Sequence, residues 1–243
     1  MRIIVAESPV NRTHQKADII DCFGFAVYYE REMDTRIVRV DPEKCIPAEI
    51  KRVARILKDD GMVVYPTDTF YGLGVNCFSP MAIRRAYGLK KRNPSKPLSV
   101  VISDREMLHS VAIDIPSLFE SLAAEFWPGP LTLVLRSNPL IPDVLLGSQK
   151  TIGLRLPDHT WLRELVRTAN FPITATSANI AGKVEISDPV KAIRVFQGKV
   201  DCVVDGGVTR GGLSSTVVDM TTEKPSILRE GAIPSHQLER FWT

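Results

Sequence analysis

The sequence has few cysteines, and none is placed as a zinc site or a disulfide framework would require. Cysteine occurs only at positions 22, 45, 77 and 202, with no Cys-x-x-Cys pair and no histidine at ligand spacing beside any of them. Structural zinc sites and small disulfide-bonded folds depend on such spacings. We therefore expect a reduced, cytoplasmic protein with no metal site of its own.

Long hydrophobic runs and an excess of one charge are also absent. The apolar runs, such as Leu131 to Leu135, are far shorter than the ~20 residues that span a bilayer. The amino terminus reaches Glu7 before the apolar core of a secretory signal could form. Lysine and arginine total 31 against 28 acidic residues, a net charge of +3. We expect no membrane segment, and the net charge alone does not indicate nucleic-acid binding.

Several standard catalytic motifs are missing. The chain contains neither G-x-x-x-x-G-K-[ST] nor a G-x-G-x-x-G after a strand, and no G-x-S-x-G. Its four histidines are scattered, and His159 falls at a strand-to-helix corner, where we expect a structural or solvent-exposed role. These absences disfavour the common phosphate loops, the nucleophile elbow and histidine acid–base catalysis.

What the chain does contain is a regular alternation of strand and helix patterns. Strands are expected at 36–40, 62–65, 98–102, 131–136, 152–156, 173–176, 200–204, 216–220 and 227–229. Helices are expected at 48–58, from Pro80, after a Ser103–Glu106 capping box, at 116–127, at 159–169 and at 188–198, with Gly61 as a left-handed cap. This pattern predicts a single α/β domain with an open, twisted, mixed sheet and flanking helices. We assign it to residues 36–243, preceded by an extension of unknown role at 1–35.

A run of positive charge occurs at residues 84–96. It holds six basic residues among thirteen and no acid. A solvated helix face is the ordinary explanation. However, Asn93–Pro94 should break the helix just after Lys90 and Arg92. Because an ammonium and a guanidinium both bind phosphate oxygens, we expect these two cations to form an anion clamp.

Hydroxyl and amide side chains gather where several strands end. They occur at 67–69, 176–179 and 214–216. Plain serine or asparagine turns explain such residues as well. In α/β proteins, however, loops at strand ends commonly hold ligands. Together with the basic run, they predict a polar cavity that accepts anions.

Six short motifs carry a family resemblance. They are Pro-Thr-Asp-Thr-Phe-Tyr-Gly-Leu-Gly at 66–74, Lys-x-Arg at 90–92 with Pro-Leu at 97–98, Pro-Gly-Pro-Leu-Thr at 128–132, Gly-Leu-Arg-Leu-Pro at 153–157, Ser-Ala-Asn at 177–179, and Ser-Thr-Val-Val-Asp at 215–219 with Leu-Arg-x-Gly at 228–231. In this order, between about Arg36 and Ile233, they resemble the YrdC/YciO family. Because the sequence ends at Thr243, we expect the single-domain type of the family, without the extra carboxyl-terminal domain of longer members.

The resemblance implies an L-threonylcarbamoyladenylate synthase, a nucleotidyltransferase. Such an enzyme makes threonylcarbamoyl-AMP and pyrophosphate from L-threonine, bicarbonate and ATP, for N6-threonylcarbamoyladenosine at position 37 of tRNA. The resemblance also implies a YrdC-like domain with a concave basic face, and Mg²⁺ accompanying ATP. As further partners it implies tRNA or double-stranded RNA and a downstream threonylcarbamoyl transferase complex.

The same resemblance assigns site residues. Its Lys-x-Arg and Ser-x-Asn tetrad falls on the catalytic candidates Lys90, Arg92, Ser177 and Asn179. Threonine is expected to contact Thr69, Arg136 and Ser215. ATP is expected to contact Lys90, Arg92, Lys96, Thr132, Ser177 and Arg229. A threonyl carbamate is already anionic, so its attack on phosphorus needs positioning and charge neutralisation more than a strong base.

Three positions depart from the family pattern. Val101 stands where many members carry a histidine, and Ala181 and Glu185 stand where serines are usual. Ala181 and Glu185 bear on the adenine-nucleotide assignment, and Val101 bears on amino-acid specificity. The alternative is a YciO-type relative that binds RNA or another nucleotide without synthase activity, with residues 84–96 tracking phosphates; the intact tetrad argues against it. A purely structural role is the least favoured interpretation, because polar strand ends beside a basic clamp are costly in a scaffold.

Overall fold

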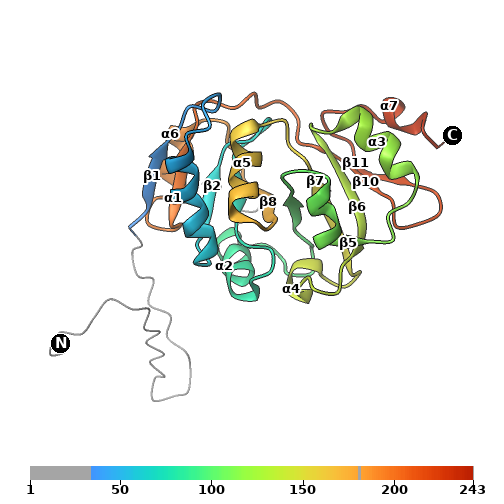
Figure 1. The fold of residues 1–243 in the computed structure, drawn as a ribbon, viewed down its shortest axis with the longest axis horizontal. Helices are drawn as coiled ribbons and strands as arrows, with labels where there is room; N and C mark the ends of the chain where they lie inside the picture. The colour runs from blue at the N-terminus through green and yellow to red at the C-terminus, as the bar shows by residue number, and fades with distance from the viewer. Residues whose placement is uncertain (1–33, 180–181, 243) are drawn as a thin grey trace, which may run out of the picture. The chain divides into compact units, whose positions relative to one another are not determined.

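The computed structural model describes residues 34–179 and 182–242, and within these ranges a mixed sheet runs through the protein (Figure 1). Its strands are β1 (Arg36–Arg39), β2 (Val63–Tyr65), β3 (Gly72–Gly74), β4 (Ser99–Val101), β5 (Ala112–Ile113), β6 (Leu131–Ser137), β7 (Thr151–Arg155), β8 (Ile173–Ser177), β9 (Cys202–Asp205), β10 (Thr216–Asp219) and β11 (Ser226–Arg229). The helices are α1 (Pro47–Lys58), α2 (Pro80–Lys90), the 3₁₀ helix η1 (Glu106–Ser110), α3 (Leu118–Phe126), α4 (Asp143–Leu146), α5 (Thr160–Ala169), α6 (Pro189–Phe196) and α7 (Ser235–Glu239).

The strand order is β1-β9-β2-β3-β8-β4-β7-β6-β10-β11, with β5 paired to β6. Pairing is parallel in β1–β9, β9–β2, β4–β7 and β6–β10, and antiparallel in the other pairs. The predicted mixed α/β sheet with flanking helices is therefore confirmed.

Alternating side chains of the strands divide the core into two clusters. On β2, Val63 and Tyr65 join α1 and α5 on one face of the sheet, whereas Val64 joins the cluster on the opposite face. The opposite cluster also takes residues from α2, α3 and α6. Successive strand residues point to opposite faces, so a strand buried on both faces must be apolar throughout. This explains the short, continuous apolar runs of the sequence.

Two local predictions about helix ends are wrong. The helix expected after Ser103 is the short η1, and no capping box forms, because the Asp104 carboxylate accepts the Met107 amide proton at 3.0 Å. The left-handed residue after α1 is Asp60, with φ 58°, and not Gly61. Gly61 is required for another reason, since a Cβ there would lie 2.6 Å from the Ile56 carbonyl oxygen.

Four short elements were not predicted, namely β3, β5, α4 and α7. All have five residues or fewer, too few to show a helical or strand period. In the described ranges, no helix combines the length and apolar character that crossing a bilayer requires. The predicted extension at 1–35 lies outside the described residues except for its last two.

Candidate active site

A cavity of about 570 Å³ lies over one face of the sheet. Its floor consists of alternate residues of neighbouring strands, such as Thr151, Gly153 and Arg155 on β7, whereas Ile152 and Leu154 belong to the core on the opposite face. The cavity is therefore on the same face as α1 and α5, where α5 leaves part of the sheet uncovered (Figure 1). Its volume is in the range of small-molecule sites, roughly 300–1,000 Å³.

Gly153 keeps the floor of the cavity open. A Cβ at this position would lie 2.6 Å from Ser99 Oγ and 3.2 Å from Thr132 Cγ2. Any side chain would therefore displace these two hydroxyl-bearing residues, both of which line the cavity.

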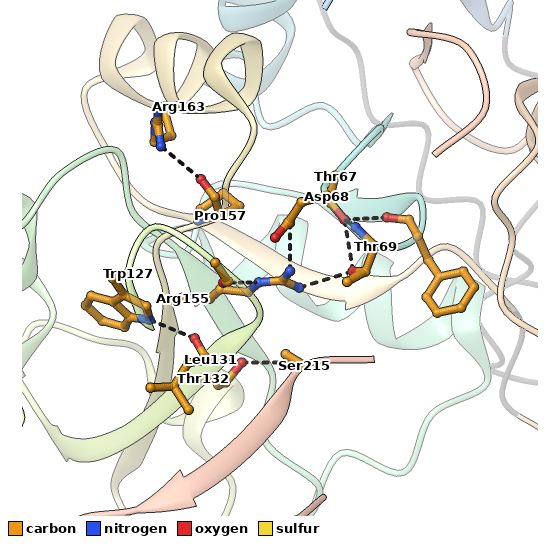
Figure 2. Close-up of polar contacts among 12 residues, drawn as sticks. Thr67, Asp68, Thr69, Trp127, Leu131, Thr132, Arg155, Pro157, Arg163 and Ser215 are labelled. Carbon is orange, nitrogen blue, oxygen red and sulfur yellow. Dashed lines mark hydrogen bonds and ion pairs between the residues drawn. The ribbon is translucent and has the colours of Figure 1, made fainter. Parts of the chain in front are cut away.

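Arg155 is the central cation of the cavity, and sequence reasoning missed it (Figure 2). Its Nη2 lies 2.6 Å from an Asp68 carboxylate oxygen, and its Nη1 donates to Thr69 Oγ1 at 3.3 Å. Its Nε donates to the Gly129 carbonyl at 3.2 Å. The Arg155 and Asp68 side chains are only 10% and 4% exposed. An arginine within the otherwise apolar run Ile-Gly-Leu-Arg-Leu was the signal that could have identified it.

A second hydroxyl cluster forms where β6 and β10 run side by side. Thr132 Oγ1 and Ser215 Oγ are 2.9 Å apart and share a hydrogen bond, which a dashed line marks in Figure 2. Arg229 on β11 donates from Nη2 to the Ser215 carbonyl at 2.8 Å and to Ser215 Oγ at 3.2 Å. All three residues, predicted from the sequence as contacts of threonine or ATP, line the cavity.

Three members of the tetrad, Lys90, Ser177 and Asn179, are in contact, whereas Arg92 donates to the carbonyls of Lys96 and Pro97. Lys90 Nζ donates to the carbonyl oxygens of Ser177 and Asn179, and to Asn179 Oδ1 at 3.1 Å. Burial, with the positive charge of Arg92, lowers the pKa of Lys90 to about 8. Arg92 and Ser177 line the cavity, whereas Lys90 lies behind the Ser177 turn and is not part of the cavity wall.

Two predicted contacts lie outside the cavity. Lys96 is exposed, and it is its main-chain carbonyl that accepts hydrogen bonds, from Tyr87 and Arg92. Arg136 is exposed and lines a separate hollow beside Asp114 and Lys150. Side chains alternate between the two faces along β6, so Thr132 and Arg136, four residues apart, lie on the same face of the sheet. Arg136 is closer to the end of the strand than Thr132.

The positions that depart from the family pattern have different surroundings. Val101 lines the cavity and is buried. Glu185 also lines it, and both of its carboxylate oxygens lie 2.8 Å from Ser214 Oγ. Ala181 lies outside the described residues.

The described histidines do not line the cavity. His159 is the N-cap of α5, where its Nδ1 accepts the Leu162 amide proton at 3.3 Å. Burial lowers the pKa of His159, so the neutral form that can accept this bond is favoured. The structural role expected for His159 is confirmed.

Comparisons with known proteins agree with this geometry. The family model Sua5/YciO/YrdC, described as telomere recombination, matches residues 55–231. Threonylcarbamoyl-AMP synthase of Pyrococcus abyssi is 38% identical over 192 residues, which are 79% of this chain and 56% of the relative. The Bacillus subtilis protein of the same name is 37% identical over 196 residues, 79% of this chain and 56% of the relative. The chain thus spans a little over half the length of these relatives.

Solved structures share the fold. The crystal structure of P. abyssi Sua5 complexed with L-threonine matches with a TM-score of 0.82 and 38% identity, over 85% of this chain and 61% of that one. The structure of E. coli YciO matches with a TM-score of 0.76 and 25% identity, over 82% of this chain and 97% of that one. The chain belongs to the Sua5/YciO/YrdC family.

Proposed function

We propose that the protein is an L-threonylcarbamoyladenylate synthase. Its reaction would join L-threonine, bicarbonate and ATP into threonylcarbamoyl-AMP, with release of pyrophosphate and water. The observation that carries the proposal is one cavity lined by Arg92, Arg155 and Arg229 together with buried hydroxyl groups, in a chain of this family. Two relatives that bear the name of this activity, and a relative's structure with L-threonine, support it.

The cavity offers two chemically distinct parts. Around Arg155, the hydroxyl-bearing residues Thr69, Thr132 and Ser215 are at most 8% exposed. We assign this part to threonine, because a small amino acid with a carboxylate and a hydroxyl is matched by fixed polar groups. Ser177, Arg92 and Arg229 are assigned to ATP. Lys96 and Arg136 are left out of the proposal, because they do not line the cavity.

The reaction requires the protein to position the two substrates and to stabilise negative charge. A carbamate oxygen of N-carboxythreonine would attack the α-phosphorus of ATP, and the bond from that phosphorus to pyrophosphate would break. Because the nucleophile is already an anion, no histidine is needed. Guanidinium groups aimed at the phosphates would stabilise the charge that develops on the leaving group, an effect worth roughly 3–4 kcal/mol for a well-placed donor.

Magnesium would arrive as part of the substrate MgATP. The described residues contain no cluster of three or more histidine, cysteine, aspartate or glutamate side chains that could cage a metal. Magnesium usually keeps several waters and is held by one or two carboxylates plus substrate phosphates. Glu185 and Asp219 are the carboxylate residues that line the cavity, and they fit this limited role.

The product suggests partners and a compartment. A mixed carbamic–phosphoric anhydride is reactive, so a transferase that passes the group to tRNA would have to receive it soon after release. We infer tRNA and such a transferase complex as downstream partners, and the cytoplasm as the location. The free thiols of Cys45, Cys77 and Cys202 are compatible with a reducing compartment.

Threonine-dependent pyrophosphate release from ATP and bicarbonate tests the proposal. Wild-type protein with Mg²⁺ should release pyrophosphate only when L-threonine is present. Arg92→Ala should abolish release, whereas Arg84→Ala, an exposed arginine of the same basic run, should not. No release by the wild type would refute the synthase, and tight, salt-sensitive RNA binding without turnover would favour the YciO-type alternative.

A further inference from the structure

The Lys90 ammonium is committed to protein acceptors. The residue is 3% exposed, and its three partners are the carbonyl of Ser177, the carbonyl of Asn179 and Asn179 Oδ1. A charged lysine has three N–H donors. The three partners therefore use its full donor capacity, which leaves none to hold a phosphate.

The Asn179 amide has only one orientation that satisfies its neighbours. Its Nδ2 donates to the Lys183 carbonyl, and its Oδ1 accepts from Lys90 Nζ. A flipped amide would face a carbonyl with its oxygen and an ammonium with its NH₂, so both contacts would become repulsive. Lys90 and the Lys183 carbonyl together fix the position of Oδ1.

This orientation determines which way the Ser177 hydroxyl points. Ser177 Oγ lies 2.8 Å from Asn179 Oδ1. An amide oxygen only accepts, so the Ser177 proton must be donated to it. Ser177 lines the cavity and can therefore offer only lone pairs to a ligand. Phosphate oxygens that lack a proton also only accept, and they would find no donor there.

We propose that Lys90 is a positioning residue that, through Asn179, makes Ser177 a hydrogen-bond acceptor, and that the substrate group meeting Ser177 is an N–H or O–H donor, not a phosphate oxygen. The identity of the substrate rests on the proposed function, whereas the contacts among Lys90, Asn179 and Ser177 do not depend on that function. It replaces the direct contact of Lys90 with ATP that the sequence suggested.

A double-mutant cycle tests the chain of contacts. Lys90→Met and Asn179→Ala should each lower kcat/KM about tenfold or more, and the double variant should lose little beyond the worse single variant, because both act through Ser177. If Lys90 touched a phosphate itself, the two losses would multiply, which would overturn the proposal. Lys91→Met removes an exposed neighbouring charge and should leave kcat/KM unchanged.

Pyrophosphate inhibition tests the acceptor role of Ser177. Ser177→Ala should lower kcat/KM while leaving the inhibition constant of pyrophosphate unchanged, because a hydroxyl that donates to Asn179 cannot also donate to phosphate. A several-fold weaker inhibition by pyrophosphate in Ser177→Ala would overturn the acceptor role. Arg92→Ala supplies the positive comparison, since loss of a cavity guanidinium should weaken pyrophosphate binding.

A measurement without substrate tests the proposal even if the variants fail to fold or the wild type shows no turnover. The ¹³C carbonyl signals of Ser177 and Asn179 should titrate with a midpoint near pH 8, because neutral Lys90 has only two N–H donors for three acceptors. Arg92 and Glu185 are the charged groups that act on this midpoint. Lys90→Arg, which stays charged, should abolish the titration. Carbonyl signals of Ser177 and Asn179 that are the same in the wild type and in Lys90→Met at pH 7 would overturn the positioning role of Lys90 whatever the reaction is.

Discussion

At the scale of single residues, the cavity depends on a buried ion pair. Arg155 and Asp68 come from segments 87 residues apart and meet with little exposure to water. Burying two charges costs more than their attraction returns unless further hydrogen bonds satisfy them. The bonds of Arg155 to Thr69 and to the Gly129 carbonyl supply this, so the guanidinium is held rigidly in the cavity.

Removing Arg155 alone should be costly for stability. In Arg155→Met, the free energy of unfolding should fall by about 3–5 kcal/mol, because the Asp68 charge is left buried and unpaired. Arg155→Met combined with Asp68→Asn should recover most of this loss but no pyrophosphate release. Urea denaturation and the synthase assay measure the two effects. A loss below about 1 kcal/mol in the single variant would mean that water compensates Asp68.

Filling the floor should affect activity more than folding. Gly153→Ala places a methyl group against the Ser99 hydroxyl, so we expect pyrophosphate release to fall at least about tenfold through displacement of cavity groups. Gly88→Ala is the matched control, because a Cβ there meets nothing within 4 Å on helix α2. It should leave activity intact and add about 0.5–1 kcal/mol of stability. Equal activity in the two variants would show that the ligand does not use the floor.

At the scale of elements, helix α2 directs two cations to different places. It ends at Lys91 in a left-handed conformation, φ 51°, and the Arg92 amide closes the turn on the Tyr87 carbonyl at 3.1 Å. The reversal of the chain sends Lys90 toward the Ser177 turn and Arg92 toward the cavity. The sequence predicts the break at Asn93–Pro94, two residues later, and predicts that the two cations form one anion clamp.

Two serines at helix N-termini should contribute differently to stability, because only one of them caps its helix. Ser79 Oγ accepts the Ala82 amide proton at the start of α2, whereas Ser117, the N-cap of α3, makes no such bond. Ser79→Ala should cost about 1 kcal/mol of unfolding free energy, and Ser117→Ala close to none. Thermal or urea denaturation of both variants checks this. Equal losses would contradict the capping role of Ser79.

At the scale of the whole molecule, one sheet provides both the core and the site. Helices α1 and α5 cover one face of the sheet at strands β1 and β2. On the same face, the region around β7, β6 and β10 holds the cavity. A sheet face left uncovered and lined with polar groups is unfavourable for folding alone and favourable when a ligand fills it. Ligand binding and stability should therefore be coupled.

The coupling predicts stabilisation by substrates. L-threonine at about 100 times its dissociation constant should raise the free energy of unfolding by about 2.7 kcal/mol at 25 °C, because it binds only the folded state. Differential scanning fluorimetry with increasing L-threonine, and separately with MgATP, measures the shift. Glycine, which lacks the hydroxyl and methyl groups, is the control. No shift with L-threonine would argue against the assigned threonine pocket.

The prediction from sequence was most accurate for long elements and for motif order. Helices α1 and α5 and strands β6 to β10 show clear periods or apolar runs. The cavity is lined by five residues that the motifs assigned to substrates, namely Thr69, Thr132, Ser177, Ser215 and Arg229. The direction of Lys90 and the exposed positions of Lys96 and Arg136 outside the cavity wall could not be predicted in this way. Each depends on where a long, flexible side chain finds its acceptors, which no local period encodes.

The amino-acid sequence by itself determined the strand and helix alternation, the family and the residue types available for anion chemistry, because these follow from hydrophobic periodicity and from motifs of adjacent residues. Only the tertiary structure decided which polar groups meet. Arg155 finds Asp68, and Lys90 finds the Ser177 turn, across separations of 87 residues in each case. Such pairings are selected by burial and by the need to satisfy every buried donor and acceptor, and that requirement acts in space, not along the chain.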